Sequence, residues 1–193
     1  MAGAAGVEPT SAVLETVILP LNYAPMSYIV SHYIKLYNNT IHFLSYSIIG
    51  GFMIVPYTTK ELDLIARLMR AEAVGEGDLG MLMVGNVVVN RVLANCLAFK
   101  NLTSVTDVIY QNPGGFAGVS GNLFNSAATT LEKELANRVL LGEYYYPATN
   151  ALWFYAPSSG ASCIPYWYNQ KLAGRYKSHC FYQPDPGVCA ELH

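Results

Sequence analysis

Apolar and polar residues recur with a helical period over residues 62–73. When each residue advances the chain by about 100°, the apolar side chains fill an arc of roughly 200° and most charged ones lie opposite. Just before this stretch, Thr58 and Glu61 have the spacing of a capping box. The pattern therefore predicts an amphipathic helix that opens at Thr58, runs to about Ala73 and is stopped by Gly75 and Gly77.

Glu72 departs from this arrangement because it projects from near the middle of the apolar arc. A carboxyl group there faces the core or a cleft in the core, and burial disfavours its charged form and raises its pKa. Such a group suits a general acid that works near neutral pH. The structural alternative is a buried glutamate paired with an arginine, and position alone leaves both interpretations open.

A second helix is expected from about Leu79 to Leu97, with Asp78 as its cap. It is apolar nearly all round, which is typical of a helix at the centre of a core. Asn86 and Asn90 are four residues apart and share one face of it. Their amides need hydrogen-bond partners, for which Glu72, a sugar or neighbouring backbone are the candidates.

Later segments predict a short helix over 104–110, a glycine-rich loop over 112–122 and a third long helix from Ser126, as cap, to about Leu141. Loops of this length in a compact domain are usually functional or disordered. The third helix should turn some residues inward and others to solvent: inward Leu131, Leu135 and Val139, and outward Glu132, Lys133 and Glu134.

The last part of the chain is rich in aromatic residues and predicts extended structure. It contains a strand over 151–155, a short extended segment over 166–169 and a strand over 176–182. Helices first and a small antiparallel sheet afterwards make an α+β domain, which we expect to span residues 58–193.

Residues 1–57 differ from the rest, since they hold only Glu8, Glu15 and Lys35 as charged residues. Polar residues interrupt the apolar stretch, so it makes a poor membrane span, and it is not a clean signal peptide. Three interpretations stay open: a poor membrane anchor, a disordered extension, and an over-extended gene start with the true initiator at Met53. The last is favoured, and membrane association is not expected.

The composition narrows the function classes. Only 12% of the residues are charged and no basic run occurs, so a nucleic-acid partner is not expected. The 15 Tyr and 2 Trp residues suit sugar rings as well as plain packing. The spacing of Cys96, Cys163, Cys180 and Cys189 does not match a zinc site, and no metal is expected. Disulfides among the last three, or a dyad of Cys96 with His179, stay open.

Five ordered blocks together resemble the SleB/CwlJ family of cell-wall hydrolases. They are Ala-Arg-Leu-Met-Arg-Ala-Glu-Ala-Val-Gly-Glu (66–76), Val-Gly-Asn-Val-Val-Val-Asn-Arg-Val (84–92), Val-Ile-Tyr-Gln (108–111), Leu-Trp-Phe-Tyr-Ala-Pro (152–157) and Ser-His-Cys-Phe-Tyr (178–182). The segment 167–184 is similar to the CwlJ branch in particular.

The resemblance implies a lysozyme-related α+β domain that degrades spore-cortex peptidoglycan during germination, with Glu72 as the catalytic acid. It implies glycan strands containing muramic-δ-lactam as substrate, and either lytic transglycosylase or hydrolase chemistry at the bond between muramic acid and N-acetylglucosamine. It also implies a location at the coat–cortex boundary of the spore, a spore-coat partner protein, no cofactor, and indirect activation by calcium dipicolinate. The alternative is a non-catalytic coat protein that keeps the fold.

The remaining site candidates are sugar contacts or supporting groups. Glu76 is expected to pair with Arg91 or Arg70, and Phe116 to take the place of an aromatic residue that the family carries after its Tyr-Gln pair. The full set of substrate-binding candidates is Glu76, Asn86, Asn90, Gln111, Phe116, Tyr155, Tyr168 and His179.

Overall fold

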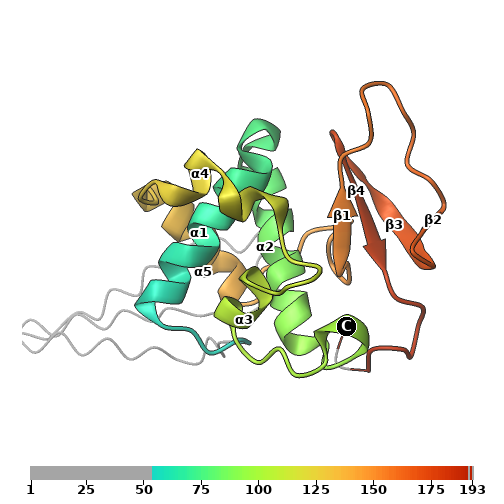
Figure 1. Ribbon diagram of the computed structural model, residues 1–193, viewed down its shortest axis with the longest axis horizontal. Coiled ribbons are helices and arrows are strands. Elements are labelled where there is room, and N and C mark those ends of the chain that lie inside the picture. The colour runs from blue at the N-terminus through green and yellow to red at the C-terminus, as the bar shows by residue number, and fades with distance from the viewer. Residues whose placement is uncertain (1–53, 191, 193) are drawn as a thin grey trace, which may run out of the picture.

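A computed structural model describes residues 54–190 and 192 of the chain. A group of helices packs beside one small sheet (Figure 1). The three longest helices, α1 (Thr59–Ala73), α2 (Gly77–Leu93) and α5 (Thr130–Leu140), contact one another and enclose the main hydrophobic core. Helices followed by a small antiparallel sheet are the α+β architecture predicted from the sequence, and that prediction is confirmed.

Short helical elements join the long ones. Their bounds are η1 (Val74–Glu76), η2 (Leu97–Phe99), α3 (Val105–Ile109), η3 (Ala117–Ser120) and α4 (Asn122–Asn125). The predicted short helix over 104–110 corresponds to α3, with the Ser104 side chain as its cap. The predicted loop over 112–122 holds the helical turn η3 and the start of α4.

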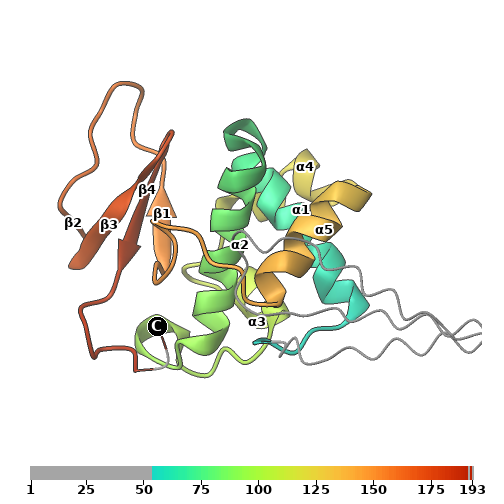
Figure 2. The ribbon, with the colours of Figure 1, turned by 180° about the vertical axis from the view of Figure 1, so that it is seen from behind.

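The sheet comprises β1 (Trp153–Tyr155), β2 (Tyr166–Trp167), β3 (Gln170–Tyr176) and β4 (His179–Gln183) in the antiparallel order β1-β4-β3-β2. In both views α2 lies between α1 and the sheet, and β1 is the strand nearest to α2 (Figures 1 and 2). Phe154 of β1 pairs with Phe181 of β4, and both pack against the main core. The sheet thereby covers one flank of the helices.

The helix α1 begins as the sequence predicts. Thr58 Oγ1 accepts a hydrogen bond from the Glu61 N–H at 3.2 Å, and Glu61 Oε2 accepts one from the Thr58 N–H at 2.9 Å. Both halves of the capping box are therefore present.

The bounds of α2 correct the prediction at both ends. Glu76 is its N-cap residue and Asp78 lies within its first turn, so Asp78 is not the cap. The helix ends at Leu93, because Asn95 and Leu97 have φ angles of 37° and 51°, which an α-helix does not accept.

The start of α5 also differs from the prediction. Thr129 and Glu132 form its capping box, and Ser126 precedes the helix. Its buried face includes Glu132 at 8% exposure, whereas Leu131 is 50% exposed. The expected inward face was therefore right for Leu135 and Val139 and wrong for Leu131, and the expected solvated face was wrong for Glu132.

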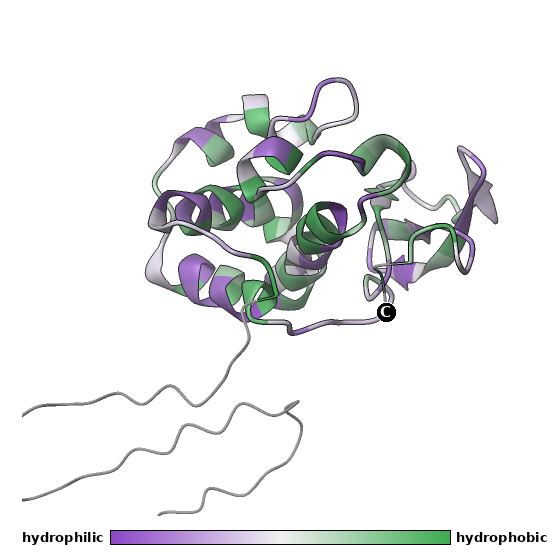
Figure 3. Ribbon diagram, turned by 90° about the horizontal axis from the view of Figure 1, so that it is seen from below, coloured by the Kyte–Doolittle hydropathy of each residue, from purple (hydrophilic) through white to green (hydrophobic). Residues whose placement is uncertain are grey.

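A glycine sets the distance between the long helices. A Cβ atom on Gly85 of α2 would lie 2.8 Å from Val139 Cγ2 and 3.0 Å from Met69 Sδ. Because those atoms belong to α5 and α1, only the missing side chain lets the three helices meet here. The helices carry both hydrophobic and hydrophilic residues along their lengths (Figure 3), as amphipathic helices do.

The expected single strand over 176–182 is instead a hairpin. Lys177 and Ser178 form the turn between β3 and β4, and Lys177 has a φ angle of 45°. Lys177 thus adopts the left-handed conformation that glycine or asparagine usually supplies in turns, so the sequence gives no turn signal there.

Two disulfides tie the irregular parts of the chain. One joins Cys96 to Cys189 and the other joins Cys163 to Cys180. Cys163 and Cys180 belong to the set that the sequence left open, but the pairing of Cys96 was not foreseen because that residue was assigned to a helix. Since Cys96 is disulfide-bonded, it cannot form a dyad with His179.

The packed region takes in residues ahead of Thr58. Val55 is fully buried, and the Tyr57 hydroxyl donates to Asn137 Oδ1 at 2.6 Å. The three interpretations concern the N-terminal extension, residues 1–57, of which residues 1–53 lie outside the described residues. Between residues 54 and 190 no helix is both long and apolar enough to cross a membrane.

Candidate active site

Glu72 lies in the last turn of α1, and its side chain is partly buried. The Gly118 N–H donates a hydrogen bond to Glu72 Oε1 at 2.6 Å. Burial raises the pKa of Glu72 above its ordinary value, although the Gly118 hydrogen bond and the charge of Arg91 act in the opposite direction. Among the described residues no hydrogen-bond partner is found for Oε2. The carboxyl group is therefore anchored through one oxygen while the other can carry a proton.

Glycine is required at position 118 for this contact. A Cβ atom there would lie 2.8 Å from Glu72 Oε1 and 3.0 Å from Ala71 Cβ. The turn η3 thus rests directly on the end of α1. The glycine-rich loop that stood out in the sequence supplies the N–H that holds the candidate acid.

Arg91 approaches from α2 and is 5% exposed. Its Nε donates to the Leu152 carbonyl at 2.8 Å and its Nη1 to the Gly114 carbonyl at 3.3 Å. Its guanidinium carbon lies 4.4 Å from the ring centre of Phe116. Burial lowers the pKa of Arg91 to about 10, and the charge of Glu72 partly opposes that change. Arg91 therefore belongs to the surroundings of Glu72, not to an ion pair with Glu76.

Glu76 is held by the hairpin turn between β3 and β4. Its carboxylate accepts hydrogen bonds from the Ser178 N–H at 3.3 Å and from the Ser178 hydroxyl, and its main-chain carbonyl accepts one from Lys177. Its Oε1 lies 3.9 Å from His179 Nδ1. Burial acts to raise the pKa of Glu76, but the Ser178 hydrogen bonds and the charges of His179 and Lys177 outweigh it, so the pKa is lowered. The predicted pairing of Glu76 with an arginine was wrong.

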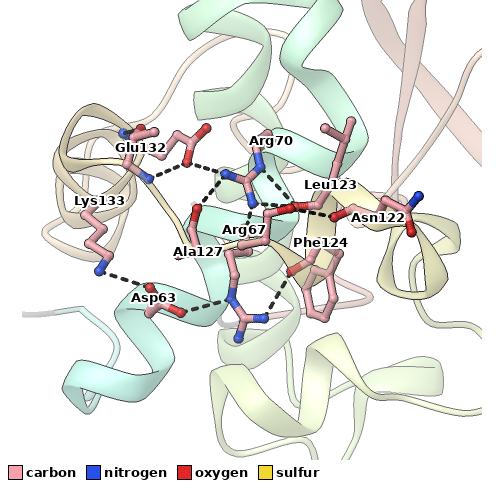
Figure 4. A network of polar contacts seen from close by, with 11 residues as sticks. Asp63, Arg67, Arg70, Asn122, Leu123, Phe124, Ala127, Glu132 and Lys133 are labelled. Atoms are coloured by element: carbon pink, nitrogen blue, oxygen red, sulfur yellow. Dashed lines mark hydrogen bonds and ion pairs between the residues drawn. The ribbon is translucent and has the colours of Figure 1, made fainter.

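Arg70 has a structural role on another face of α1. Its guanidinium donates to Glu132 Oε2 at 3.0 Å and to the carbonyls of Leu123, Ser126 and Ala127 (Figure 4). The neighbouring Arg67 donates to the Phe124 carbonyl at 3.0 Å. These two arginines fasten α4 and the start of α5 to α1.

Asn86 and Asn90 are fully buried and use main-chain partners. Asn86 Nδ2 donates to the Glu143 carbonyl at 2.6 Å and Asn86 Oδ1 accepts from the Tyr145 N–H at 2.9 Å. Asn90 Nδ2 donates to the carbonyls of Ala148, Thr149 and Ala151. Of the alternatives that the sequence left open, the structure shows backbone partners. Neither amide reaches a surface that a glycan could touch, which corrects their place among the substrate-binding candidates.

Gln111 immediately precedes the glycine-rich loop, and Phe116 lies on it. Gln111 Nε2 donates to the Ala98 carbonyl at 3.0 Å. Both residues line a surface depression of about 450 Å³ that continues to Ala117 and Val119, the neighbours of Gly118. Phe116 is only 6% exposed and packs near Phe154, with 6.1 Å between ring centres. The depression therefore lies next to the segment that holds Glu72.

The three remaining candidates lie on two faces of the sheet. His179 packs edge-on against Phe154 at 5.3 Å, on the face toward the helices. Tyr155 follows Phe154 in β1 and so faces the other way, where it contacts Trp167 at 4.8 Å. Tyr168 is 80% exposed and lies 5.0 Å from Trp167. The structure thus groups Tyr155 and Tyr168 with each other and not with Glu72.

Sequence reasoning missed the roles of Gly118, Ser178 and Arg91. The signal for Arg91 was its position as the single cation in an apolar helix. Gly118 and Ser178 gave no signal of their own, because each contact joins residues far apart in the chain. Among the described residues no cluster of His, Cys, Asp and Glu side chains is suited to a metal ion.

Known proteins match the sequence of this chain over most of the domain. The Cell Wall Hydrolase family matches residues 75–182. Cell wall hydrolase CwlJ of Oceanobacillus iheyensis is 49% identical over 139 residues, which cover 72% of this chain and 97% of that protein. Cell wall hydrolase CwlJ of Bacillus subtilis is 45% identical over 140 residues, which cover 72% of this chain and 96% of that protein.

Solved structures with a similar fold were found as well. The catalytic domain of the Bacillus cereus SleB protein has a TM-score of 0.52 and 25% identity, covering 69% of this chain and 99% of that one. The catalytic domain of the germination-specific lytic transglycosylase SleB from Bacillus anthracis has a TM-score of 0.53 and 22% identity. The match covers 67% of this chain and 100% of that one. The second likeness concerns the fold alone. By its sequence, the chain belongs to the cell wall hydrolase family.

Proposed function

We propose that this protein cleaves the glycosidic bond between N-acetylmuramic acid and N-acetylglucosamine in peptidoglycan, with Glu72 as its acid and base. The observation that carries the proposal is the setting of the Glu72 carboxyl group. Burial raises its pKa, the Gly118 N–H holds Oε1, and Oε2 has no partner among the described residues. A carboxyl group of this kind is protonated at a higher pH than an exposed one and can give up its proton in one defined direction.

The reaction needs only this one carboxyl group. Protonated Glu72 gives its proton to the glycosidic oxygen as the bond from that oxygen to C1 of muramic acid breaks, through an oxocarbenium-like transition state. The ionised Glu72 then takes the proton of the C6 hydroxyl of the same sugar. The C6 oxygen bonds to C1 and closes a 1,6-anhydro ring, so no water is consumed.

The position of Glu76 favours this route over hydrolysis. A hydrolase of the usual kind needs a second carboxylate to activate water or to attack C1. Glu76 is the acidic residue nearest to Glu72 in sequence beyond the helix end, and its carboxylate is already bound to Ser178 in the hairpin turn. We therefore favour a lytic transglycosylase.

We extend the proposal to the cortex of bacterial spores, on the basis of the sequence resemblance to the CwlJ branch and the CwlJ relatives. The substrate would be glycan strands with muramic-δ-lactam, degraded during germination at the coat–cortex boundary. A coat partner protein and indirect activation by calcium dipicolinate belong to the same proposal. Release of muropeptides from cortex, compared with vegetative wall, with and without coat extract and calcium dipicolinate, tests each part separately.

Mass spectrometry of the muropeptides released by the full chain, by Glu72→Gln and by Glu134→Gln tests the chemistry. Glu134 is exposed on α5 and serves as the matched control. We expect anhydro-muramic products from the wild type and the control, and a loss of roughly 100-fold or more in Glu72→Gln. Reducing-end products that disappear in Glu72→Gln would indicate hydrolysis instead. Undiminished release by Glu72→Gln would overturn the role of Glu72, and no release by any form, with coat extract present, would favour the non-catalytic coat protein.

A further inference from the structure

Arg91 is a buried cation on a helix that is otherwise largely apolar. It is 5% exposed, and the described residues around it offer it no carboxylate within ion-pair distance. Burying a guanidinium without such a partner is costly, so its other contacts must offset the lost hydration. They are the carbonyls of Leu152 and Gly114 and the faces of two rings, Phe99 at 4.9 Å and Phe116 at 4.4 Å.

These contacts connect Arg91 to the segment that holds Glu72. Along residues 114–118, the carbonyl of Gly114 accepts from Arg91, the ring of Phe116 lies on the guanidinium, and the N–H of Gly118 donates to Glu72. One end of this short segment is thus fixed by Arg91 and the other end meets the carboxyl group. The Leu152 carbonyl, immediately before β1, ties the same guanidinium to the edge of the sheet.

Other charged groups on the packed elements are engaged elsewhere. Glu76 of η1 binds the hairpin turn, where Lys177 and His179 also contact it. Arg70 on α1 pairs with Glu132 of α5. Arg91 is the charged side chain whose field acts on Glu72.

We propose that Arg91 is the positioning residue of the Glu72 acid. Its guanidinium holds the 114–118 segment so that the Gly118 N–H meets the carboxyl group, and its positive charge acts on the same carboxyl group. This inference rests on the proposed function, because it assigns Arg91 to the reaction that Glu72 performs. An arginine suits the place better than a lysine, since its planar fork can bond two carbonyls and lie between two rings at once.

Two variants separate the two parts of the proposal. Arg91→Lys keeps the charge and loses the fork, whereas Arg91→Met loses both. The matched control is Arg67→Met, because Arg67 also bonds a main-chain carbonyl and lies 5.0 Å from a ring centre, in both cases that of Phe124. Each variant is prepared as the full chain. Two quantities are measured: the titration of the Glu72 carboxyl carbon by NMR, assigned with Glu72→Gln, and the pH profile of muropeptide release.

The sign of the expected shift follows from the charge. Glu72 must be protonated to act, so activity falls as the pH rises through its pKa. The positive charge of Arg91 lowers that pKa, so Arg91→Met should move both the NMR titration and the alkaline limb of activity to higher pH. We expect about a tenfold loss of optimal rate as well. Arg91→Lys should show a similar loss of rate with a smaller shift of the limb, because its charge remains while the Gly118 hydrogen bond, which also lowers the pKa of Glu72, is lost. Arg67→Met should show neither change.

Each outcome either supports or overturns the proposed role of Arg91. If Arg91→Met leaves the Glu72 titration and the alkaline limb where they are in the wild type, or loses activity only in proportion to unfolded protein, the proposal is wrong. If Glu72 titrates at higher pH in Arg91→Met while Glu72→Gln remains active, the influence of Arg91 on Glu72 is supported and the proposed catalytic role of Glu72 is wrong. Should Arg91→Met not fold, Arg91→Gln, which retains donors and lacks the charge, carries the same expectation.

Discussion

Glu72 and Glu76 are four residues apart, yet their environments move their pKa values in opposite directions. Glu72 lies in the last turn of α1, where burial dominates and its pKa is raised. Glu76 lies in the turn η1 between α1 and α2, where the Ser178 hydrogen bonds and the nearby His179 and Lys177 side chains lower its pKa. A pair of carboxyl groups separated in this way marks one as an acid and the other as an ionised anchor.

The Glu72→Gln variant should be more stable than the wild type at neutral pH. Because the folded-state pKa of Glu72 is raised above its ordinary value of 4.5, its contribution to stability is fully present below that value and is lost as the pH rises through the folded-state pKa. Glutamine has no such charged form and can still accept the Gly118 N–H. Urea unfolding between pH 4 and pH 8 should show the advantage of the variant growing as the pH rises. An advantage that does not depend on pH would show that Glu72 is not shifted.

The Glu76→Gln variant should show the opposite pH dependence. The folded-state pKa of Glu76 lies below 4.5, so its stabilisation is present above that value and is lost as the pH falls through the folded-state pKa. At pH 7 we expect the variant to lose about 1.5–3 kcal/mol, the usual range for hydrogen bonds to a charged group. The same urea series measures it, and the deficit should shrink in acid. A deficit that grows in acid would contradict the assignment of Glu76 as an ionised anchor.

At the scale of elements, local signals located the long helices but did not always fix their ends. The capping box of α1 lies within four residues, and the sequence predicted it. The start of α5 was misplaced because Ser126 and Thr129 are both good caps, and the choice depends on Glu132 turning inward to Arg70, which is 62 positions away. The β3–β4 turn was missed because Lys177, and not a glycine, takes the left-handed conformation.

Removing Arg70 should therefore weaken the attachment of α4 and the start of α5 to α1, which depends on contacts between residues far apart in the sequence. Arg70→Met leaves the buried Glu132 carboxylate without its cation and frees the carbonyls of the α4 segment. We expect a loss of about 3–5 kcal/mol in the free energy of unfolding, measured with urea.

A double-mutant cycle isolates the ion pair within that loss. If the pair matters, Arg70→Met combined with Glu132→Gln should cost clearly less than the sum of the single changes, because the second change removes the unpaired charge. Strict additivity would mean that the main-chain contacts of Arg70 carry the whole effect. Lys133→Met, which removes the partly exposed partner of Asp63, is the control and should cost no more than about 1 kcal/mol.

At the scale of the whole molecule, the order of helices and sheet was predictable, and the way in which they meet was not. Periodicity and aromatic content gave the succession of elements. The contacts that build the site join Glu72 to Gly118 and Glu76 to Ser178, with sequence separations of 46 and 102. Nothing in the local pattern encodes such pairs. The four cysteines allow three complete pairings. Because Cys96 was assigned to a helix, its disulfide with Cys189 was not predicted.

That disulfide should contribute more stability than the other. Cys96–Cys189 spans 93 residues and brings the end of the chain against Phe99 and Leu152, whereas Cys163–Cys180 spans 17. In the chain-entropy account, loops of these lengths correspond to roughly 4.5 and 3 kcal/mol. Replacing both cysteines of a pair by alanine should therefore lower the free energy of unfolding more for the longer loop. Calorimetry and urea unfolding of the two double variants, with the fully reduced wild type as reference, measure the difference. A larger loss from the shorter loop would mean that local packing around Cys180, and not restriction of the unfolded chain, decides what each disulfide contributes.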